Sequence, residues 1–303
     1  MRYGLTIDTS QPLPRVVEQV QRMADAGFAS ASSSQIFGYD ALTMLAVVGQ
    51  NVPGIELATG VVPTYPRHPI MLAAQALTVQ AATGGRLTLG IGLSHQIVIE
   101  TVFGQSFDHP LRHMREYLSV LLPVLRGEAA SFQGETLSGT TWGPLEIDAP
   151  APPVVVAALG PKMLELAGTV ADGTVTWMTG PTTVRDHIVP TITAAAAAAG
   201  RPSPRVTVAL PVCVTDDVDA ARATAAEEFS IYGTLPSYRA MLDREKAAGP
   251  GDVAIVGDEA AVADQLTALE VAGATEVVAS IYGDAAERDR TFALLARLAK
   301  GAR

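Results

Sequence analysis

Few side chains in this 303-residue chain combine a reactive group with a position at the end of an apolar segment, and His95 is the clearest of them. It closely follows the apolar segment 87–92. An unperturbed imidazole has a pKa of about 6.5, so His95 could donate a hydrogen bond or a proton to a reducible substrate near neutral pH. It could equally be a helix-capping or a solvated residue.

Glycines mark two further places where chemistry could occur. Gly90 and Gly92 remove side chains from the segment 87–92, so a flat ring or a phosphate could approach the backbone there. Tight packing of a strand–helix–strand unit explains the same pair. Gly160 and Pro161 follow the apolar segment 154–158 and open a helical pattern, where free N–H groups could hold a phosphate. Proline in a plain first helical turn is the other reading.

The remaining reactive residue types give little support for catalysis by the protein alone. Trp177 ends an apolar segment and could form a wall against a flat ring or simply pack there. Cys213 has no activating partner evident in the sequence and is interpreted as a small buried apolar residue. His, Asp and Glu residues do not cluster at metal-ligand spacing, so no metal is expected. A site this poor in acid–base groups suits a bound cofactor that carries the reaction.

Eight apolar runs alternate with helical patterns along the chain. These elements must position the candidate residues named above. Continuous apolar runs are typical of parallel strands buried on both faces. Eight repeats favour a closed (β/α)8 TIM barrel over an open doubly wound sheet, and no G-x-G-x-x-G follows the first strand. The active site of such a barrel lies at the carboxyl ends of the strands. The expected strands are 3–8, 28–33, 56–61, 87–92, 154–158, 174–177, 206–214 and 276–280, and the expected helices are 13–26, 41–50, 70–82, 111–125, 162–170, 184–199, 218–232, 259–272 and 285–299.

Two segments interrupt this alternation. Residues 127–153 follow the expected helix 111–125 and contain a pattern typical of a hairpin turning at Gln133-Gly134. Residues 235–257 are irregular or short-helical and precede the last strand. Both are too short to be separate domains, so we expect one domain, 1–303, with two insertions.

Charge and composition restrict the partners. The net charge of −10 and the lack of a basic run argue against nucleic acid or an anionic membrane as the main partner, and favour a small-molecule substrate. No apolar run approaches the roughly 18–20 residues that a membrane span needs. The first residues resemble a strand more than a signal peptide, and a single cysteine suits a reducing compartment, so a cytoplasmic location is expected.

Four ordered segments resemble the bacterial luciferase-like monooxygenase superfamily: A-T-G-V-V-P-T-Y-P-R-H-P (58–69), G-G-R-L-T-L-G-I-G-L-S-H (84–95), S-F-Q-G-E-T-L (131–137) and V-A-A-L-G-P-K-M-L-E-L-A-G-T-V-A-D-G (156–173). Q-I-F-G-Y-D-A-L-T (35–43) and D-G-T-V-T-W-M-T-G-P (172–181) are closer to the branch that uses the deazaflavin coenzyme F420. The resemblance implies the same (β/α)8 fold and a protein that is often a dimer.

The resemblance also implies a cofactor site. A bulge after Thr59 would carry a non-prolyl cis peptide, Gly60–Val61, behind the cofactor ring. The predicted cofactor-binding residues are Ser34, Gln35, Thr59, Gly60, Val61, Leu93, Ser94, His95 and Trp177, together with the phosphate-binding backbone of Ala158, Leu159, Gly160 and Pro161. His95 is also the predicted catalytic residue.

The chain departs from the sugar-phosphate dehydrogenases of this superfamily at two positions. Those members carry Asp-His where this chain has Ser34-Gln35, and a carboxylate where it has His95. We therefore expect hydride transfer from reduced F420 to an activated C=C, C=N or carbonyl group, with the proton from His95 or solvent. The alternatives are an FMN-dependent monooxygenase that uses dioxygen, a flavin- or deazaflavin-binding protein without turnover, and an unrelated barrel isomerase or lyase that binds a phosphate.

Overall fold

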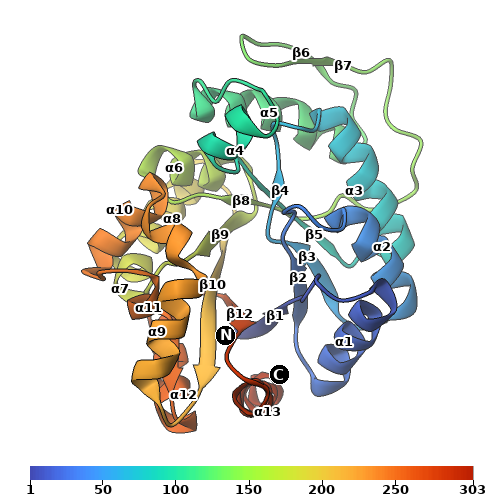
Figure 1. The fold of residues 1–303 in the computed structure, drawn as a ribbon. Coiled ribbons are helices and arrows are strands. Elements are labelled where there is room, and N and C mark those ends of the chain that lie inside the picture. The colour runs from blue at the N-terminus through green and yellow to red at the C-terminus, as the bar shows by residue number, and fades with distance from the viewer. Residues whose placement is uncertain (303) are drawn as a thin grey trace. The chain divides into compact units, whose positions relative to one another are not determined.

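The computed structural model describes residues 1–302, in which strands and helices alternate along most of the chain (Figure 1). The strands are β1 (Arg2–Thr6), β2 (Ser30–Ser33), β3 (Glu56–Thr59), β4 (Val62–Pro63), β5 (Leu87–Gly92), β6 (Ser131–Gln133), β7 (Ser138–Thr140), β8 (Val154–Ala157), β9 (Gly173–Trp177), β10 (Arg205–Val214), β11 (Ile255–Gly257) and β12 (Glu276–Ile281). The helices are α1 (Leu13–Ala26), α2 (Ala41–Asn51), α3 (Pro69–Thr83), α4 (Gln96–Thr101), α5 (Pro110–Leu125), α6 (Pro161–Val170), α7 (Pro181–Thr183), α8 (Val189–Ala198), α9 (Val218–Glu228), α10 (Pro236–Glu245), α11 (Pro250–Val253), α12 (Glu259–Val271) and α13 (Ala285–Gly301). A π-helical turn, η1 (Val184–Ile188), and a 3-10 turn, η2 (Ser230–Gly233), complete the list. Across residues 1–302, no helix is both long and apolar enough to cross a membrane.

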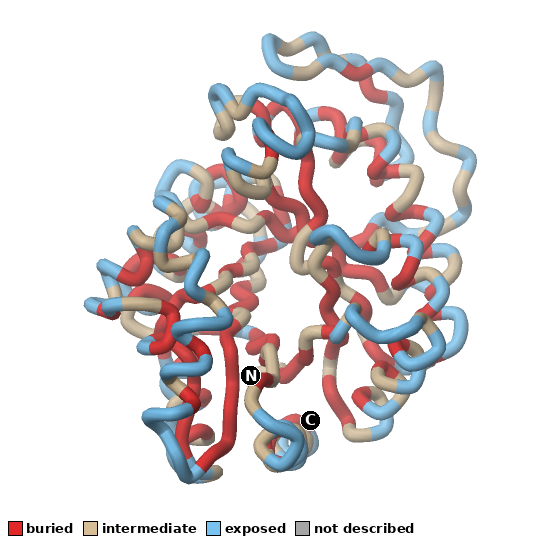
Figure 2. Tube along the Cα trace, viewed as in Figure 1, coloured by how far each residue is buried: buried red, intermediate tan, exposed pale blue. Residues whose placement is uncertain are grey.

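One parallel sheet contains all strands except the β6–β7 hairpin. Its order is β11-β10-β12-β1-β2-β3-β5-β8-β9, with β4 beside β5 and a further pairing between β9 and β10. The β9–β10 pairing closes this order, and β3 with β4 forms one interrupted strand, so the fold is the (β/α)8 barrel predicted from the sequence. The strands are largely buried, whereas exposed residues concentrate on the helices and loops (Figure 2).

Two compact units emerge from the internal contacts, and each is described by itself. The first contains Met1–Ile7, Arg22–Ser32 and the chain from Ala158 onward, and α6 packs against α8 within it. The second contains Asp8–Gln21 and Ser33–Ala157, and α3 packs against both α2 and α5 within it (Figure 1).

The structure corrects several predicted elements. The strand expected over 56–61 ends at Thr59 and resumes as β4, and the short helix α4 was not expected. The insertion 235–257 contains α10, α11 and a strand, β11, which pairs with the end of β10. The helix expected over 184–199 begins at Pro181 and passes through the π turn. The hairpin predicted near Gln133-Gly134 is confirmed as β6–β7.

Aspartate side chains cap the starts of four helices, whereas helix α6, which contributes to the proposed site, has no side-chain cap. The carboxylates of Asp40, Asp217, Asp258 and Asp284 accept hydrogen bonds from first-turn N–H groups of α2, α9, α12 and α13. Helix α6 begins at Pro161 after Gly160, and no side chain caps it. Its first-turn N–H groups are therefore left for other acceptors.

Candidate functional site

The second unit carries a bulge where β3 gives way to β4. Ala58 pairs with Thr88 of β5, but Val62 pairs with Ile91, so the β3–β4 side contains one residue more than β5 over this interval. The Gly60–Val61 peptide within the bulge is cis, as the resemblance implied.

Thr59 replaces the backbone pairing that the bulge interrupts. Its hydroxyl accepts a hydrogen bond from Gly90 N at 2.8 Å and donates one to Gly90 O at 2.7 Å. Both Thr59 and Gly90 are buried. The hydroxyl thus satisfies two backbone groups that have no access to water.

Packing accounts for the two glycines of β5. A Cβ at Gly90 would lie 1.9 Å from Thr59 O, and a Cβ at Gly92 would lie 2.6 Å from Val61 Cγ2. The bulge itself fills the space that the missing side chains leave. Of the two readings open from the sequence, tight packing is therefore the one that the structure supports at these positions.

The segment after β2 holds the bulge from its other side. Ser33 O accepts from Gly60 N at 2.8 Å, Ser34 Oγ donates to Gly60 O at 2.6 Å, and Gln35 N donates to Val61 O at 3.1 Å. The Gln35 side chain is used locally, since its Oε1 accepts from Ala41 N at 2.7 Å. These bonds bring four of the predicted residues, Ser34, Gln35, Gly60 and Val61, into one cluster.

The chain leaves the core at the end of β5. Leu87–Gly92 is buried throughout, whereas Leu93, Ser94 and His95 are each partly exposed. Ser94 has a left-handed backbone with φ of 61°, which turns the chain into α4. His95 occupies the N-cap position of α4 without a capping side-chain bond, and burial lowers the pKa of its imidazole. At neutral pH His95 is therefore mainly a neutral ring.

A second histidine supports β4 from helix α5, and the sequence analysis missed it. His113 Nε2 lies 3.0 Å from Thr64 Oγ1, and its ring stacks on Tyr65 at a centroid distance of 3.9 Å. Thr64 N in turn donates to Gly92 O at 2.9 Å. Burial lowers the pKa of His113 to about 4, so this ring is neutral in the folded protein at neutral pH. Its position in the middle of a helical pattern gave no sequence signal.

The first unit contains the predicted phosphate-binding segment, Ala158–Pro161. Gly160, Pro161 and Lys162 are exposed, and nothing lies within 4 Å of the point where a Gly160 Cβ would be. The carbonyls before them are bonded: Ala158 O accepts from Thr174 Oγ1 at 3.4 Å, and Leu159 O lies 2.7 Å from His187 Nε2. An uncapped helix start with open space in front of it fits a phosphate or another small anion.

Trp177, at the end of β9, belongs to an aromatic cluster. Its ring meets Phe229 edge-on at 5.6 Å and Tyr232 at 5.8 Å, and Tyr232 meets Tyr238 at 5.0 Å. Trp177 and Tyr232 are partly exposed. The aromatic residues Phe229, Tyr232 and Tyr238 follow β10 along the chain. They were not singled out in the sequence, because aromatic residues at the end of a helical pattern or just after it have no distinctive spacing.

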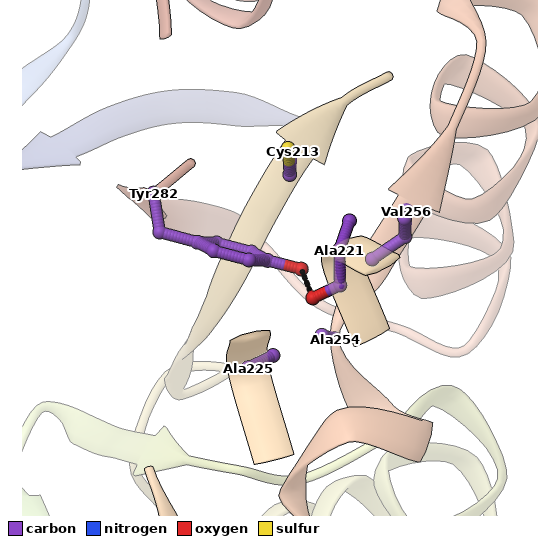
Figure 3. Packing of buried hydrophobic residues seen from close by; sticks show 6 residues of the cluster. All are labelled: Cys213, Ala221, Ala225, Ala254, Val256 and Tyr282. Atoms are coloured by element: carbon purple, nitrogen blue, oxygen red, sulfur yellow. Dashed lines mark hydrogen bonds between the residues drawn. The ribbon is translucent and has the colours of Figure 1, made fainter. Parts of the chain in front are cut away.

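Cys213 is packed as the sequence analysis expected. It lies in an apolar cluster with Ala221, Ala225, Ala254, Val256 and Tyr282, in which the Tyr282 hydroxyl points at the Ala221 carbonyl (Figure 3). Burial, with a smaller effect of Glu287, raises the pKa of the thiol to about 11. The thiolate that a nucleophile needs is thus disfavoured.

Comparison with known proteins identifies a matching family and a similar reductase. A family model described as luciferase-like monooxygenase matches residues 1–276. A 5,10-methylenetetrahydromethanopterin reductase of Methanolobus tindarius is 28% identical over 265 residues, which cover 87% of this chain and 80% of the reductase.

Solved structures share the fold at low identity. The coenzyme F420 dependent tetrahydromethanopterin reductase from Methanopyrus kandleri has a TM-score of 0.82 at 21% identity and covers 98% of this chain and 97% of its own. The oxygenating constituent of 3,6-diketocamphane monooxygenase from Pseudomonas putida, in complex with FMN, has a TM-score of 0.76 at 17% identity and covers 99% of this chain and 97% of its own.

Proposed function

Since this chain belongs to the luciferase-like monooxygenase family and is an enzyme of that class, we propose that it transfers a hydride between reduced coenzyme F420 and a small organic substrate with an activated C=C, C=N or carbonyl group. The observation that carries the proposal is the exposed, uncapped start of α6. F420 and FMN both bear a phosphate, and this is the helix start that the resemblance assigns to it.

The protein's part in the proposed reaction is binding and proton supply. The bound deazaflavin supplies the hydride. Backbone N–H groups at Gly160 and Lys162 hold its phosphate, and the bulge at Gly60–Val61, bonded to Ser34 and Gln35, supports the ring. A ring nitrogen of His95 donates a hydrogen bond or the proton to the reduced substrate.

We propose coenzyme F420 in preference to FMN because of two proteins that are similar to this chain. The Methanopyrus kandleri reductase is named as coenzyme F420 dependent, and the Methanolobus tindarius protein is named as a 5,10-methylenetetrahydromethanopterin reductase. The FMN complex of the Pseudomonas putida monooxygenase favours the alternative, an FMN-dependent monooxygenase that consumes dioxygen.

A binding titration against both cofactors tests the proposal. The full chain is titrated with F420 and with FMN in parallel under anaerobic conditions. We expect F420 to bind at least tenfold more tightly, a difference of about 1.4 kcal/mol. Tighter FMN binding, with oxygen consumption after reduction, would replace the proposal with the monooxygenase.

Turnover separates an enzyme from a binding protein. Reduced F420 that is retained but never oxidised by a panel of activated alkenes, imines and carbonyls would support a non-catalytic deazaflavin-binding protein.

We propose in addition that the enzyme acts in the cytoplasm as a homodimer on a small molecule, without a nucleic acid or membrane partner. Sedimentation of the purified chain measures the dimer directly.

A further inference from the structure

A buried histidine lies directly behind the proposed phosphate-binding segment. His187 is 8% exposed, and its Nε2 lies 2.7 Å from Leu159 O. A carbonyl oxygen only accepts hydrogen bonds, so Nε2 must carry the proton in this contact. The bond joins η1 to Leu159, which precedes Gly160, the N-cap residue of α6, and both belong to the first unit.

His187 reaches this carbonyl from within a π-helical turn. Helix α7, the turn η1 and helix α8 follow one another without a break from Pro181 to Ala198. A π turn takes one residue more than an α turn, so it rotates the following side chains by about 100° relative to a continuous α-helix. His187 is buried at this turn, while its neighbours Arg185 and Asp186 are exposed and pair with each other at 2.7 Å.

The hydrogen bond sets the direction of the next N–H group. The Leu159–Gly160 peptide is trans, because the cis bond found among residues 1–302 is Gly60–Val61. In a trans peptide the C=O and N–H groups point in opposite directions. With Leu159 O turned toward His187, the Gly160 N–H points away from His187.

A second contact holds α6 against α8, the helix that continues from η1. Gly168, in the last turns of α6, lies so close to α8 that a Cβ there would be 2.4 Å from Ile192 O. Helix α6 is therefore fixed near its end by Gly168 and at its start by His187.

We propose that His187 is a positioning residue for cofactor phosphate: by holding Leu159 O, it orients the Gly160 N–H and the start of α6 toward the anion. This inference rests on the proposed function and adds a residue to that site. His187 does not touch the phosphate, so its effect is on affinity for the phosphate-bearing part of the cofactor.

Paired ligands test the inference, because they differ in the phosphate. Dissociation constants are measured on the full chain for FMN against riboflavin, and for F420 against its phosphate-free deazaflavin core. In His187→Leu we expect the advantage of the phosphorylated member to fall roughly tenfold, the size expected for a lost hydrogen bond near a charged group. Binding of the phosphate-free member should stay within about twofold, and His187→Gln, which keeps an N–H donor, should restore most of the advantage.

A matched control removes a different histidine–carbonyl contact. His68 Nε2 lies 3.0 Å from Ser138 O in the second unit, and His68→Leu should leave both ratios unchanged. If His187→Leu does not fold, as judged by circular dichroism, His187→Asn keeps a polar side chain that is too short to reach Leu159 O and carries the same expectation.

The possible failures are distinguishable. Equal weakening of both members of a pair in His187→Leu, or no change in either, would overturn the positioning role while leaving the proposed function intact. Binding of none of these ligands by the unchanged protein would remove the proposed function and this inference together.

Discussion

The contact between Thr59 and Gly90 shows how a single missing side chain shapes the proposed site. The Thr59 hydroxyl satisfies both backbone groups of Gly90, and Thr59 O occupies the place of a Cβ. Neither residue can change size without moving the bulge that contains Gly60 and Val61. The two readings of Gly90 in the sequence could be separated only when the opposing strand was placed beside it.

Adding one methyl group at this contact should be costly. In Gly90→Ala the new Cβ would collide with backbone, which cannot move aside as a flexible side chain can. We expect the free energy of unfolding in urea to fall by about 3 kcal/mol. Gly38→Ala is the control, since no atom lies within 4 Å of its Cβ position, and it should change stability by less than about 0.5 kcal/mol. Equal stability of the two variants would contradict the packing argument.

His95 gives the proposed reaction a defined pH dependence. Burial disfavours the charged imidazolium, so the pKa of His95 lies below its usual value of about 6.5. If the protonated ring supplies the proton, kcat/KM should decline tenfold per pH unit above a midpoint lower than 6.5. His95→Gln should abolish this slope and reduce turnover roughly 100-fold at pH 5.5. A profile that is the same in His95→Gln and in the unchanged enzyme would assign the proton to solvent.

Sequence reasoning found the residues at strand ends but not those that support them. Ser34, Gln35, Gly60 and Val61 were recognised through motifs, and their mutual bonds confirm that they are neighbours. His113 was missed, because it stands between a charged and an apolar residue in the sequence. Such a position does not indicate whether the histidine is buried or exposed.

At the scale of elements, the β6–β7 hairpin depends on one buried carboxylate. Glu116 of α5 accepts hydrogen bonds from Thr136 Oγ1 and from the N–H groups of Glu135, Thr136 and Leu137. Burial alone would raise the pKa of Glu116, but these four hydrogen bonds lower it below its usual value. The carboxylate therefore ties the hairpin turn to α5.

Replacing this carboxylate should loosen the hairpin in a pH-dependent manner. Glu116→Gln places an amide N–H among donors, and we expect a loss of about 2 kcal/mol at pH 7. Because the folded pKa lies below the unfolded value of about 4.3, the stabilisation is fully present above pH 4.3 and is lost as the pH falls through the folded pKa. Urea unfolding at pH 7 and pH 3 should show the difference between variant and parent shrinking in acid.

An exposed carboxylate in the same hairpin provides the control. Glu135 forms an ion pair with Arg112 at the surface, and Glu135→Gln should change stability by less than about 1 kcal/mol at either pH. A loss as large as that of Glu116→Gln would show that net charge, and not the turn contacts, stabilises the hairpin.

Long periodic elements were predictable, and interrupted ones were not. Helix α1 and strand β5 have the predicted bounds, since α1 keeps helical spacing throughout and β5 is one uninterrupted apolar run. The π turn at Val184–Ile188 was invisible, because one extra residue in a helix leaves the apolar spacing nearly unchanged. Strand β11 has three residues and lies within a segment rich in short helices, so its pattern was too short to detect.

At the scale of the whole molecule, part of the family motif serves the barrel more than the chemistry. Within G-G-R, Arg86 donates to Thr83 O, Ile55 O and Gly49 O at 2.7–2.8 Å, and Gly84 and Gly85 have positive φ values after α3. These contacts join the ends of α2 and α3 to the start of β3. The motif thus identified the fold correctly because it contains structural requirements, whereas the identity of the substrate depends on side chains that no motif includes.

The prediction of one domain, 1–303, can be tested by asking whether the two compact units unfold together. The division between them falls inside α1 and at the end of β2, so neither unit is a continuous piece of chain. A segment cut within a helix cannot retain that helix's hydrogen bonds, so we expect each unit to lose its structure when the other does. Hydrogen exchange in increasing denaturant should give the same opening free energy for the slowest amides of β5, in the second unit, and β10, in the first, to within about 1 kcal/mol. Opening of β5 at a clearly lower free energy, with β10 still protected, would establish two domains and would place the bulge at Gly60–Val61 in the less stable one.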